Sequence, residues 1–235
     1  MRPARFAIAG FGALWLAQAS ATSPPPALAI VLAIDVSASV DADRFVLQRD
    51  GIAHAFQDRR LADAIVAVPG GIEVLVLEWS DPDAIAVTID WRPIDDAQGA
   101  AAFAAAVHAS TRRSRGLTAI GPALLAAARQ FDRSPQRAAR QAIDISGDGI
   151  ANLGLSPAAA RDRIVRAGIT INALALPTGE PWLADYFRRE VIGGAGAFAL
   201  ASQSQASFSE AMLNKLVQEV AGASTARPAG LAQMQ

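Results

Sequence analysis

The sequence predicts an α/β fold: a Rossmann-like, doubly wound, mostly parallel sheet with one antiparallel edge strand and helices on both faces. Residues 28–34 form a run of seven aliphatic residues without polar alternation, which is typical of a strand buried on both faces. Other strand-like segments alternate with helix-like segments, which favours parallel strands joined by right-handed crossovers. One turn sequence between two strand-like segments predicts a hairpin, and its second strand supplies the antiparallel edge.

The length and composition suit one globular domain. The chain has 235 residues, of which 52% are hydrophobic and 18% are charged, and a chain of this size can bury a large core. The net charge of −1 gives no electrostatic reason to expect nucleic-acid binding. The absence of cysteine excludes disulfides, thiolate metal sites and a cysteine nucleophile.

The N-terminus has the pattern of a secretory signal peptide. Arg2 and Arg5 precede an apolar segment, and Ala19-Ser20-Ala21 has the small-x-small form of a cleavage site. An uncleaved membrane anchor is the alternative, but a span needs about 20 apolar residues and this segment is shorter. We therefore expect secretion to the periplasm. The expected segments are a signal peptide at 1–21, a proline-rich leader at 22–26, the domain at 27–221 and a flexible tail at 222–235.

The expected strands follow apolar runs of strand length. The second run is followed by the turn sequence Ser80-Asp81-Pro82-Asp83, so the third would complete a hairpin. Because the second strand should run parallel to the first, this turn should lie at the same end of the sheet as Asp35. In all, we expect strands at residues 28–34, 72–79, 84–91, 141–146, 169–176 and 197–201.

The expected helices are marked by caps and by apolar spacing. Asp41 or Asp43 is suited to cap a helix that runs to about residue 61, and Ser156 followed by Pro157 is a typical helix start. Pro122 is tolerated near the start of another helix. In all, we expect helices at about residues 41–61, 95–110, 118–131, 156–167, 181–191 and 208–220.

The first strand ends in a cluster of oxygen donors. Asp35, Ser37 and Ser39 follow directly on the aliphatic run. The carboxyl end of a strand is where an open α/β sheet binds ligands. One carboxylate and two hydroxyls, without sulfur or imidazole, suit a hard cation such as Mg²⁺ or Mn²⁺ rather than zinc.

Two later segments complete a recognisable pattern. Residues 116–124 contain Thr118 at a helix start, and residues 144–149 contain Asp148-Gly149 after a strand. With Asp35-Val36-Ser37-Ala38-Ser39, they resemble the von Willebrand factor A domain family and its metal-ion-dependent adhesion site (MIDAS), above all secreted bacterial members of uncharacterised function. The resemblance covers about residues 27–221. One departure is Ser146-Gly147, where many relatives have a hydrophobic residue and Thr.

The resemblance implies a divalent-cation-dependent protein-binding module that is not an enzyme. The metal ligands carried over are Asp35, Ser37, Ser39, Thr118 and Asp148, with the two carboxylates often acting through water. The cation would be Mg²⁺, with Mn²⁺ and Ca²⁺ as alternatives, and an acidic residue of a partner protein would complete its coordination. The carboxylates would orient waters and hydroxyls around the metal.

Two other functions stay open at this point. One is a Mg²⁺-dependent, phosphatase-like hydrolase with Asp35 as nucleophile. A haloacid-dehalogenase-like enzyme would want a second Asp where Ser37 stands and a suitable lysine, and the only lysine, Lys215, lies in the last expected helix. The other is a structural domain in which the polar residues are merely caps and turns.

Other residues near the expected site have two interpretations each. Trp79 and Trp182 would either anchor a partner or pack at the sheet edge. The 111–116 loop contains Arg112, Arg113 and Arg115. These arginines would either steer an acidic partner toward the metal or lie in solvent near the end of a helix. The two histidines, His54 and His108, lack a nucleophile motif, so we expect neither to be catalytic or to bind metal.

Overall fold

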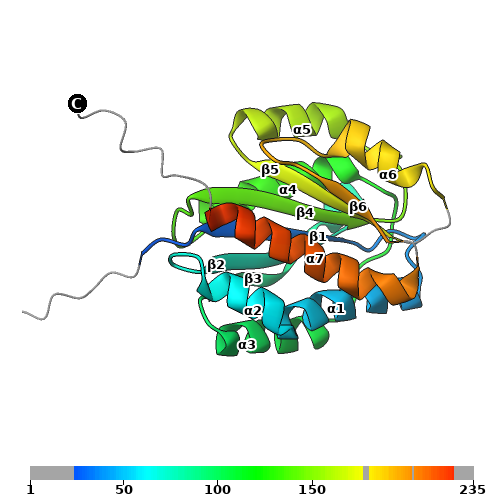
Figure 1. Ribbon diagram of the computed structural model, residues 1–235. Coiled ribbons are helices and arrows are strands. Elements are labelled where there is room, and N and C mark those ends of the chain that lie inside the picture. The colour runs from blue at the N-terminus through cyan, green and yellow to red at the C-terminus, as the bar shows by residue number, and fades with distance from the viewer. Residues whose placement is uncertain (1–23, 177–179, 203, 225–235) are drawn as a thin grey trace, which may run out of the picture.

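The computed structural model describes residues 24–176, 180–202 and 204–224. A single six-stranded sheet lies at the centre, in the order β3-β2-β1-β4-β5-β6 (Figure 1). Every neighbouring pair is parallel except β2 and β3. The expected fold class is therefore confirmed. The strands are β1 (Leu28–Asp35), β2 (Ile72–Trp79), β3 (Ala86–Ile94), β4 (Arg140–Gly147), β5 (Thr170–Ala175) and β6 (Ala199–Ala201).

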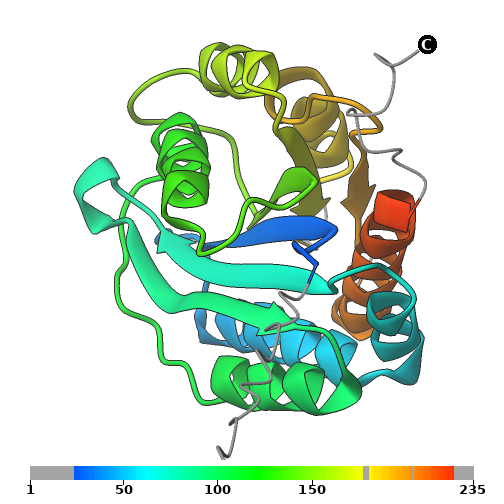
Figure 2. The same ribbon diagram turned by 90° about the vertical axis from the view of Figure 1, so that its left-hand side faces the viewer.

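Helices cover both faces of the sheet. Figure 1 and Figure 2 show α1, α2, α3 and α7 on one face and α4, α5 and α6 on the other. Three short turns occur between these elements. Two are 3₁₀ turns, η1 (Pro82–Ala84) and η2 (Phe131–Arg133), and one is a π turn, η3 (Phe187–Val191). The helices are α1 (Ala42–Gln57), α2 (Arg59–Val66), α3 (Ala97–His108), α4 (Ile120–Gln130), α5 (Pro157–Arg166), α6 (Leu183–Tyr186) and α7 (Gln205–Ser224).

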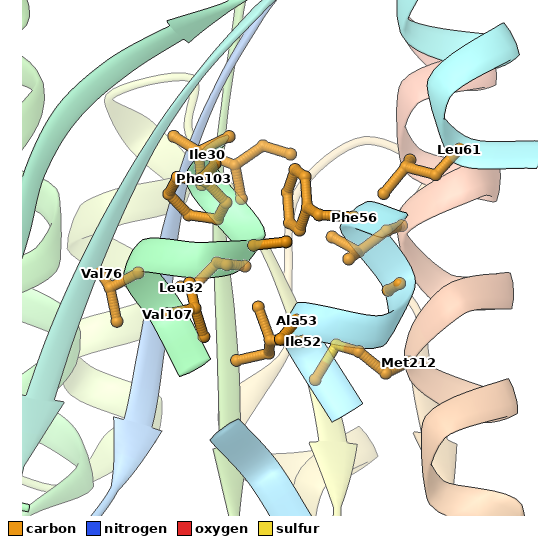
Figure 3. Packing of buried hydrophobic residues seen from close by; sticks show 14 of the residues in the cluster. Ile30, Leu32, Ile52, Ala53, Phe56, Leu61, Val76, Phe103, Val107 and Met212 are labelled. Atoms are coloured by element: carbon orange, nitrogen blue, oxygen red, sulfur yellow. The ribbon is translucent and has the colours of Figure 1, made fainter. Parts of the chain in front are cut away.

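The central strand β1 explains why the sheet needs helices on both sides. Its side chains alternate between the two faces, and all eight residues are buried. Ile30 and Leu32 join the core formed with α1, α3 and α7, where Phe56, Phe103 and Met212 meet them (Figure 3). The intervening residues Ala29, Val31 and Ala33 join the core under α4 and α5. An uninterrupted aliphatic run is thus the sequence of a strand with two apolar faces.

The expected helix at 41–61 is wrong in one respect, because the structure has two helices there. The Asp41 side chain accepts a hydrogen bond from the Arg44 N–H (2.8 Å), so the expected cap of the first helix is confirmed. Asp58 then adopts an extended backbone and accepts from the Arg60 N–H (2.8 Å). A side chain that caps a new helix in this way ends the preceding one.

Several element ends also differ from the sequence expectation. The turn η1 occupies Pro82–Ala84, so the third strand starts at Ala86 and runs on to Ile94. The expected helix at 181–191 is α6 followed by the π turn η3. Helix α7 continues to Ser224, beyond the expected start of the tail at 222.

The expected signal peptide at 1–21, the first two residues of the leader and residues 225–235 of the tail lie outside the described residues. In the described ranges, no helix combines the length and the apolar character needed to cross a membrane.

Candidate metal centre

The two aspartates of the expected site lie on neighbouring central strands. The chain builds β2 and β3 on one side of β1, and then β4, β5 and β6 on the other. The point where the strand order reverses is therefore between β1 and β4, which is where open α/β sheets bind ligands. Ile34 pairs with Ser146 in the register of these strands. Asp35 ends β1, and Asp148 follows the last residue of β4.

Hydrogen bonds join four of the five expected ligands. The Ser37 N–H donates to Asp35 Oδ1 (2.7 Å), and the Asp148 N–H donates to Asp35 Oδ2 (3.4 Å). The Ser39 hydroxyl donates to Asp148 Oδ1 (2.5 Å), and the Ser37 and Ser39 hydroxyl oxygens lie 3.2 Å apart. All of these residues except Ser39 are buried. The structure therefore brings Asp35, Ser37, Ser39 and Asp148 together.

Thr118 reaches the same region on a separate loop. Its N–H donates to the Asn152 side chain (2.8 Å), and its carbonyl accepts from the Asn152 N–H (3.0 Å). The Ala38 N–H donates to the Gly116 carbonyl (2.7 Å), which holds this loop against residues 37–39. Among the described residues, no side-chain hydrogen bond joins Thr118 to the other four. Thr118 is buried but does not cap α4, whose N-cap position is Ala119.

Gly147 explains the departure from the family pattern before Asp148. A Cβ at this position would lie 3.1 Å from Asp35 Oδ2 and within 3.5 Å of the Phe187 and Trp79 rings. The missing side chain lets the backbone after β4 pass close to Asp35. As a result the Asp148 N–H can reach the Asp35 carboxylate.

Burial dominates the electrostatics of Asp35. The pKa of Asp35 is raised to about 7. Loss of hydration is the largest cause, hydrogen bonds from Ser37 oppose it, and the negative charge of Asp148 adds to it. A buried carboxylate with a second carboxylate beside it is unfavourable unless a cation compensates. A divalent cation between Asp35 and Asp148 would supply that compensation.

Arg44 is a site residue that the sequence reasoning missed. Its guanidinium donates to Asp148 Oδ2 (3.1 Å) and to the Ser39 carbonyl (3.1 Å). It lies in the first turn of α1, three residues after the Asp41 cap, and that position directs it toward the 35–39 loop. Arg44 thus pairs with Asp148 directly, while Arg112 interacts electrostatically with both Asp35 and Asp148.

Two more polar residues fix the loop after β1. Gln48 donates to the Asp35 carbonyl (2.9 Å) and accepts from the Ser146 hydroxyl (2.6 Å). The sequence could have indicated this role, because the spacing of Gln48 from Phe45 and Ile52 places a polar residue on the apolar face of α1. Arg112 donates to three carbonyls of the loop, those of Val36, Ser37 and Val40, at 2.6 to 2.7 Å.

The structure also shows where the other arginines, tryptophans and histidines near the expected site lie. Arg112 is neither a steering charge nor a solvated residue, because its guanidinium is used within the loop, whereas Arg113 and Arg115 are exposed. Trp79 is fully buried in the core that faces α4 and α5, so it packs inside the protein and is not free to anchor a partner, whereas Trp182 is exposed. His54 is exposed on α1. His108 lies at the end of α3 and pairs with Asp50 (3.0 Å).

The residues present fit a hard divalent cation. No group of three or more His, Cys, Asp and Glu side chains in the described part of the chain could hold a metal ion. The candidate ligands are two carboxylates and several hydroxyls. Adjacent oxygens of an octahedron with 2.0–2.1 Å bonds are about 2.9 Å apart. The 3.2 Å between the Ser37 and Ser39 hydroxyls is compatible with two such positions.

One known protein family matches nearly the whole described part of this chain. The family described as "Protein of unknown function (DUF1194)" matches residues 26–224, and the chain belongs to that family. A comparison with curated proteins found no match.

Solved structures share the fold at low sequence identity. Proximal thread matrix protein 1 from the mussel byssus, solved with a zinc-occupied MIDAS motif, is 18% identical with a TM-score of 0.60, over 83% of this chain and 46% of that one. The pilus adhesin SpaC from Lactobacillus rhamnosus GG is 14% identical (TM-score 0.59), over 85% of this chain and 30% of that one. BatB from Bacteroides thetaiotaomicron is 18% identical (TM-score 0.53), over 83% of this chain and 99% of that one.

These structures establish a von Willebrand factor A-like fold for the chain. The chain spans less than half the length of the mussel protein and of the adhesin. None of the three proteins is named as an enzyme.

Proposed function

We propose that this protein is a secreted, periplasmic module that binds a partner protein through a divalent cation. Asp35, Ser37, Ser39, Thr118 and Asp148 would hold Mg²⁺, with Mn²⁺ or Ca²⁺ as alternatives. The observation that carries the proposal is the convergence of two buried carboxylates and two hydroxyls at the strand-order reversal.

The chemistry of the site suits binding rather than turnover. When bound, the cation supplies a positive charge that can attract a carboxylate. Asp35 is held at both oxygens by backbone N–H groups, and the serine hydroxyls are neutral ligands. An Asp or Glu side chain of a partner would then form a charge-assisted bond at the edge of the sheet.

The hydrolase alternative has weak support. A nucleophilic Asp35 must reach a substrate, but its side chain is fully buried and accepts hydrogen bonds at both oxygens. The only lysine of the chain, Lys215, pairs with Asp144 on α7's side of the sheet rather than with Asp35. Phosphatase assays of the Mg²⁺-loaded protein test this alternative.

The first experiment is a thermal melt with EDTA, Mg²⁺, Mn²⁺ or Ca²⁺. A ligand that binds only the folded state stabilises it by about 2.7 kcal/mol at a hundred times its dissociation constant. We expect a metal-dependent rise in melting temperature for the wild type and none for Asp35→Asn. Asp43→Asn is the matched control, because Asp43 is an exposed acid in the first turn of α1 and should leave the metal response intact.

The second experiment addresses the partner. The protein is immobilised and exposed to envelope extract in Mg²⁺ or in EDTA, beside Asp35→Asn. We expect bands that require both Mg²⁺ and Asp35. Bands that are equal in all three conditions would contradict metal-dependent binding, even if the melt shows that metal binds.

A further inference from the structure

Several arginines gather at the end of the sheet opposite the candidate metal centre. They lie in the segments that lead into β4 and β5, at the amino-terminal ends of these strands, whereas Asp35 and Asp148 lie at the carboxyl ends of β1 and β4. They come from the last turns of α4 and α5, from η2, from the loop before β4 and from the first residue of β4. We call them the basic end: Arg129, Arg133, Arg137, Arg140, Arg163 and Arg166.

The positive charge of the basic end is not balanced by acids of its own segments. All of its arginines are exposed except Arg140, which is half-buried, and within the described ranges none of them forms an ion pair. Residues 129–141 and 163–170 contain one acid, Asp132. The segment 187–197, which passes beside β5, contains two arginines and one glutamate and adds no net negative charge.

The acids of neighbouring elements do not offset this charge at the surface. Glu73 of β2 accepts from the Ser134 hydroxyl, and Glu219 of α7 lies near Arg140, but both carboxylates are buried. The exposed Asp95 and Asp96 follow β3, which is three strands away from β4. At the usual strand spacing this separation is about 14 Å, which is longer than the screening length at physiological salt. The basic end therefore presents a net positive surface.

An open hollow lies within the basic end. It has a volume of about 390 Å³, and its lining includes Arg137, Arg140, Gly168 and Thr170. The dipole of a helix accounts for arginines in the last turns of α4 and α5, but Arg137 and Arg140 lie outside helices. A guanidinium group can bind a phosphate through two parallel hydrogen bonds. The hollow thus offers two arginines to the phosphate of a lipid headgroup.

The described chain begins at this same end. The Ala139 N–H donates to the Pro26 carbonyl (3.1 Å), and the Arg140 N–H donates to the Ala27 carbonyl (3.1 Å). Figure 1 shows that β1 begins and α7 ends at this side of the sheet. The expected signal peptide ends at Ala21, and the three residues from there to Pro24 span at most about 10 Å. A signal peptide inserts into the membrane before it is cleaved, so the expected leader would hold the basic end at the membrane surface.

We propose that the basic end binds the surface of a membrane rich in anionic phospholipids and so directs the candidate metal centre away from that membrane. Clusters of about four to eight basic residues are typical of anionic lipid recognition. Strand β4 runs from Arg140 to Gly147, so about 25 Å separates the basic end from Asp148. The inference goes beyond the proposed function, because lipid binding at this end requires no metal and no partner protein.

The test is sedimentation of the protein with lipid vesicles. The chain from residue 22 is used, which is the form that the expected cleavage leaves and which contains every described helix and strand. We expect binding to vesicles of phosphatidylglycerol mixed with phosphatidylcholine, weaker binding as salt is raised, and no binding to phosphatidylcholine alone. EDTA should leave the binding unchanged. Equal binding to both kinds of vesicle, or none at low salt, would overturn the inference.

Variants with equal charge separate the basic end from the rest of the surface. Arg137→Gln with Arg166→Gln should weaken binding to the anionic vesicles about tenfold to thirtyfold, because each arginine near such a surface contributes roughly fivefold. Both residues are exposed, so the melting temperature should not change. Arg113→Gln with Arg115→Gln is the control, because it removes the same charge from an exposed loop at the metal-bearing end. Equal weakening by the two pairs would overturn the assignment to the basic end.

Two further measurements distinguish the membrane from other anionic occupants. Inorganic phosphate, added at constant ionic strength, should not displace the protein from the vesicles, because a lipid surface engages many arginines at once. Displacement by millimolar phosphate would assign the basic end to a small anion and overturn the inference. Self-association that analytical ultracentrifugation detects without lipid, and that the Arg137 and Arg166 variant loses, would assign this end to a second copy and also overturn it.

Discussion

Two buried carboxylate clusters lie along β4, and they differ in how their charge is balanced. Asp148 follows β4 and meets Asp35 of β1 through its backbone N–H. Asp144 lies within β4 and pairs with Lys215 of α7, which is also 3.7 Å from Glu219. Both clusters place two carboxylates in the interior, but only the second has a buried cation of its own.

The Lys215 cluster is buried among protein groups and is held mainly by ion pairs, since the Lys215 ammonium and the Asp144 carboxylate make no hydrogen bond. The Asn172 side chain donates to Glu219 Oε1 (2.5 Å), and the Lys215 ammonium lies 5.6 Å from the centre of the Phe198 ring. Burial, followed by the negative charge of Asp144, raises the pKa of Glu219 to about 8, while Lys215 opposes the shift. A protonated Glu219 beside an Asp144–Lys215 pair leaves little net charge in this cluster at neutral pH.

Among the described residues, the candidate metal centre has no fully buried cation, and the half-buried Arg112 interacts with Asp35 and Asp148 only electrostatically. Arg44 reaches only one oxygen of Asp148 and remains partly exposed. Only the Asp144 cluster contains an ammonium group. The buried carboxylates of Glu73 and Glu78 instead accept hydrogen bonds from the Ser134 hydroxyl and the Arg113 N–H. At the reversal of strand order, the proposal is that a divalent cation adds to the positive charge of Arg44 and Arg112.

The largest expected effect is that of removing the buried cation. Lys215→Met should lower the free energy of unfolding by about 3–5 kcal/mol, because it leaves buried carboxylates without a partner. Denaturant unfolding measures the change. Arg60→Ala is the control for a surface pair with Glu210, because both side chains are more than half exposed and the change should have little effect. Equal effects of the two substitutions would contradict a closed ionic cluster.

The next effect is a pH dependence of stability that comes from Glu219. Its folded-state pKa of about 8 lies above its ordinary value of 4.5, so the folded protein keeps a proton that the unfolded chain releases. This contribution is fully present below pH 4.5 and is lost as the pH rises through 8. Unfolding at a series of pH values should show it in the wild type.

Glu219→Gln isolates that contribution. The variant keeps the hydrogen-bonding shape of the protonated acid, so its stability should fall less than that of the wild type between pH 4.5 and 8. Asp144 and Lys215 remain in both proteins, and Asn172 still contacts residue 219. Parallel pH profiles would show that Glu219 does not hold the proton.

The smallest expected effect concerns Arg44. Arg44→Gln removes a positive charge beside Asp148 and should tighten metal binding by about threefold to tenfold, which corresponds to the interaction of two charges at partial exposure. Titration with Mn²⁺ measures the affinity. Arg49→Gln is the control, since Arg49 lies on the same helix and pairs with Asp50. Weaker metal binding would show that Arg44 mainly positions Asp148.

The sequence predicts the parts of this structure that depend on local pattern. The aliphatic run of β1 predicts a strand with two apolar faces, and the residues Asp35, Ser37 and Ser39 lie together because they share one loop. Asp148 can be placed because the carboxyl ends of neighbouring parallel strands meet. The break between α1 and α2 was missed, because Asp58 is a plausible surface residue of one longer helix as well as a cap.

Contacts between distant segments could not be predicted in the same way. Arg112 binds the carbonyls of the 36–40 loop only because α3 brings its loop beside β1. The spacing of Lys215 from Phe208 and Met212 places it on the buried side of α7. A lysine on an apolar helix face predicts that a buried carboxylate pairs with it. The pattern does not predict that this carboxylate belongs to Asp144.

The most direct test of the central claim is a count of bound metal. Electron paramagnetic resonance of free Mn²⁺ measures binding to the protein, with Mg²⁺ as the competitor and Asp35→Asn beside the wild type. The account predicts one Mn²⁺ per chain, displaced by Mg²⁺ and lost in the variant. No binding at millimolar Mn²⁺, or equal binding by the variant, would contradict a metal centre at Asp35 and Asp148.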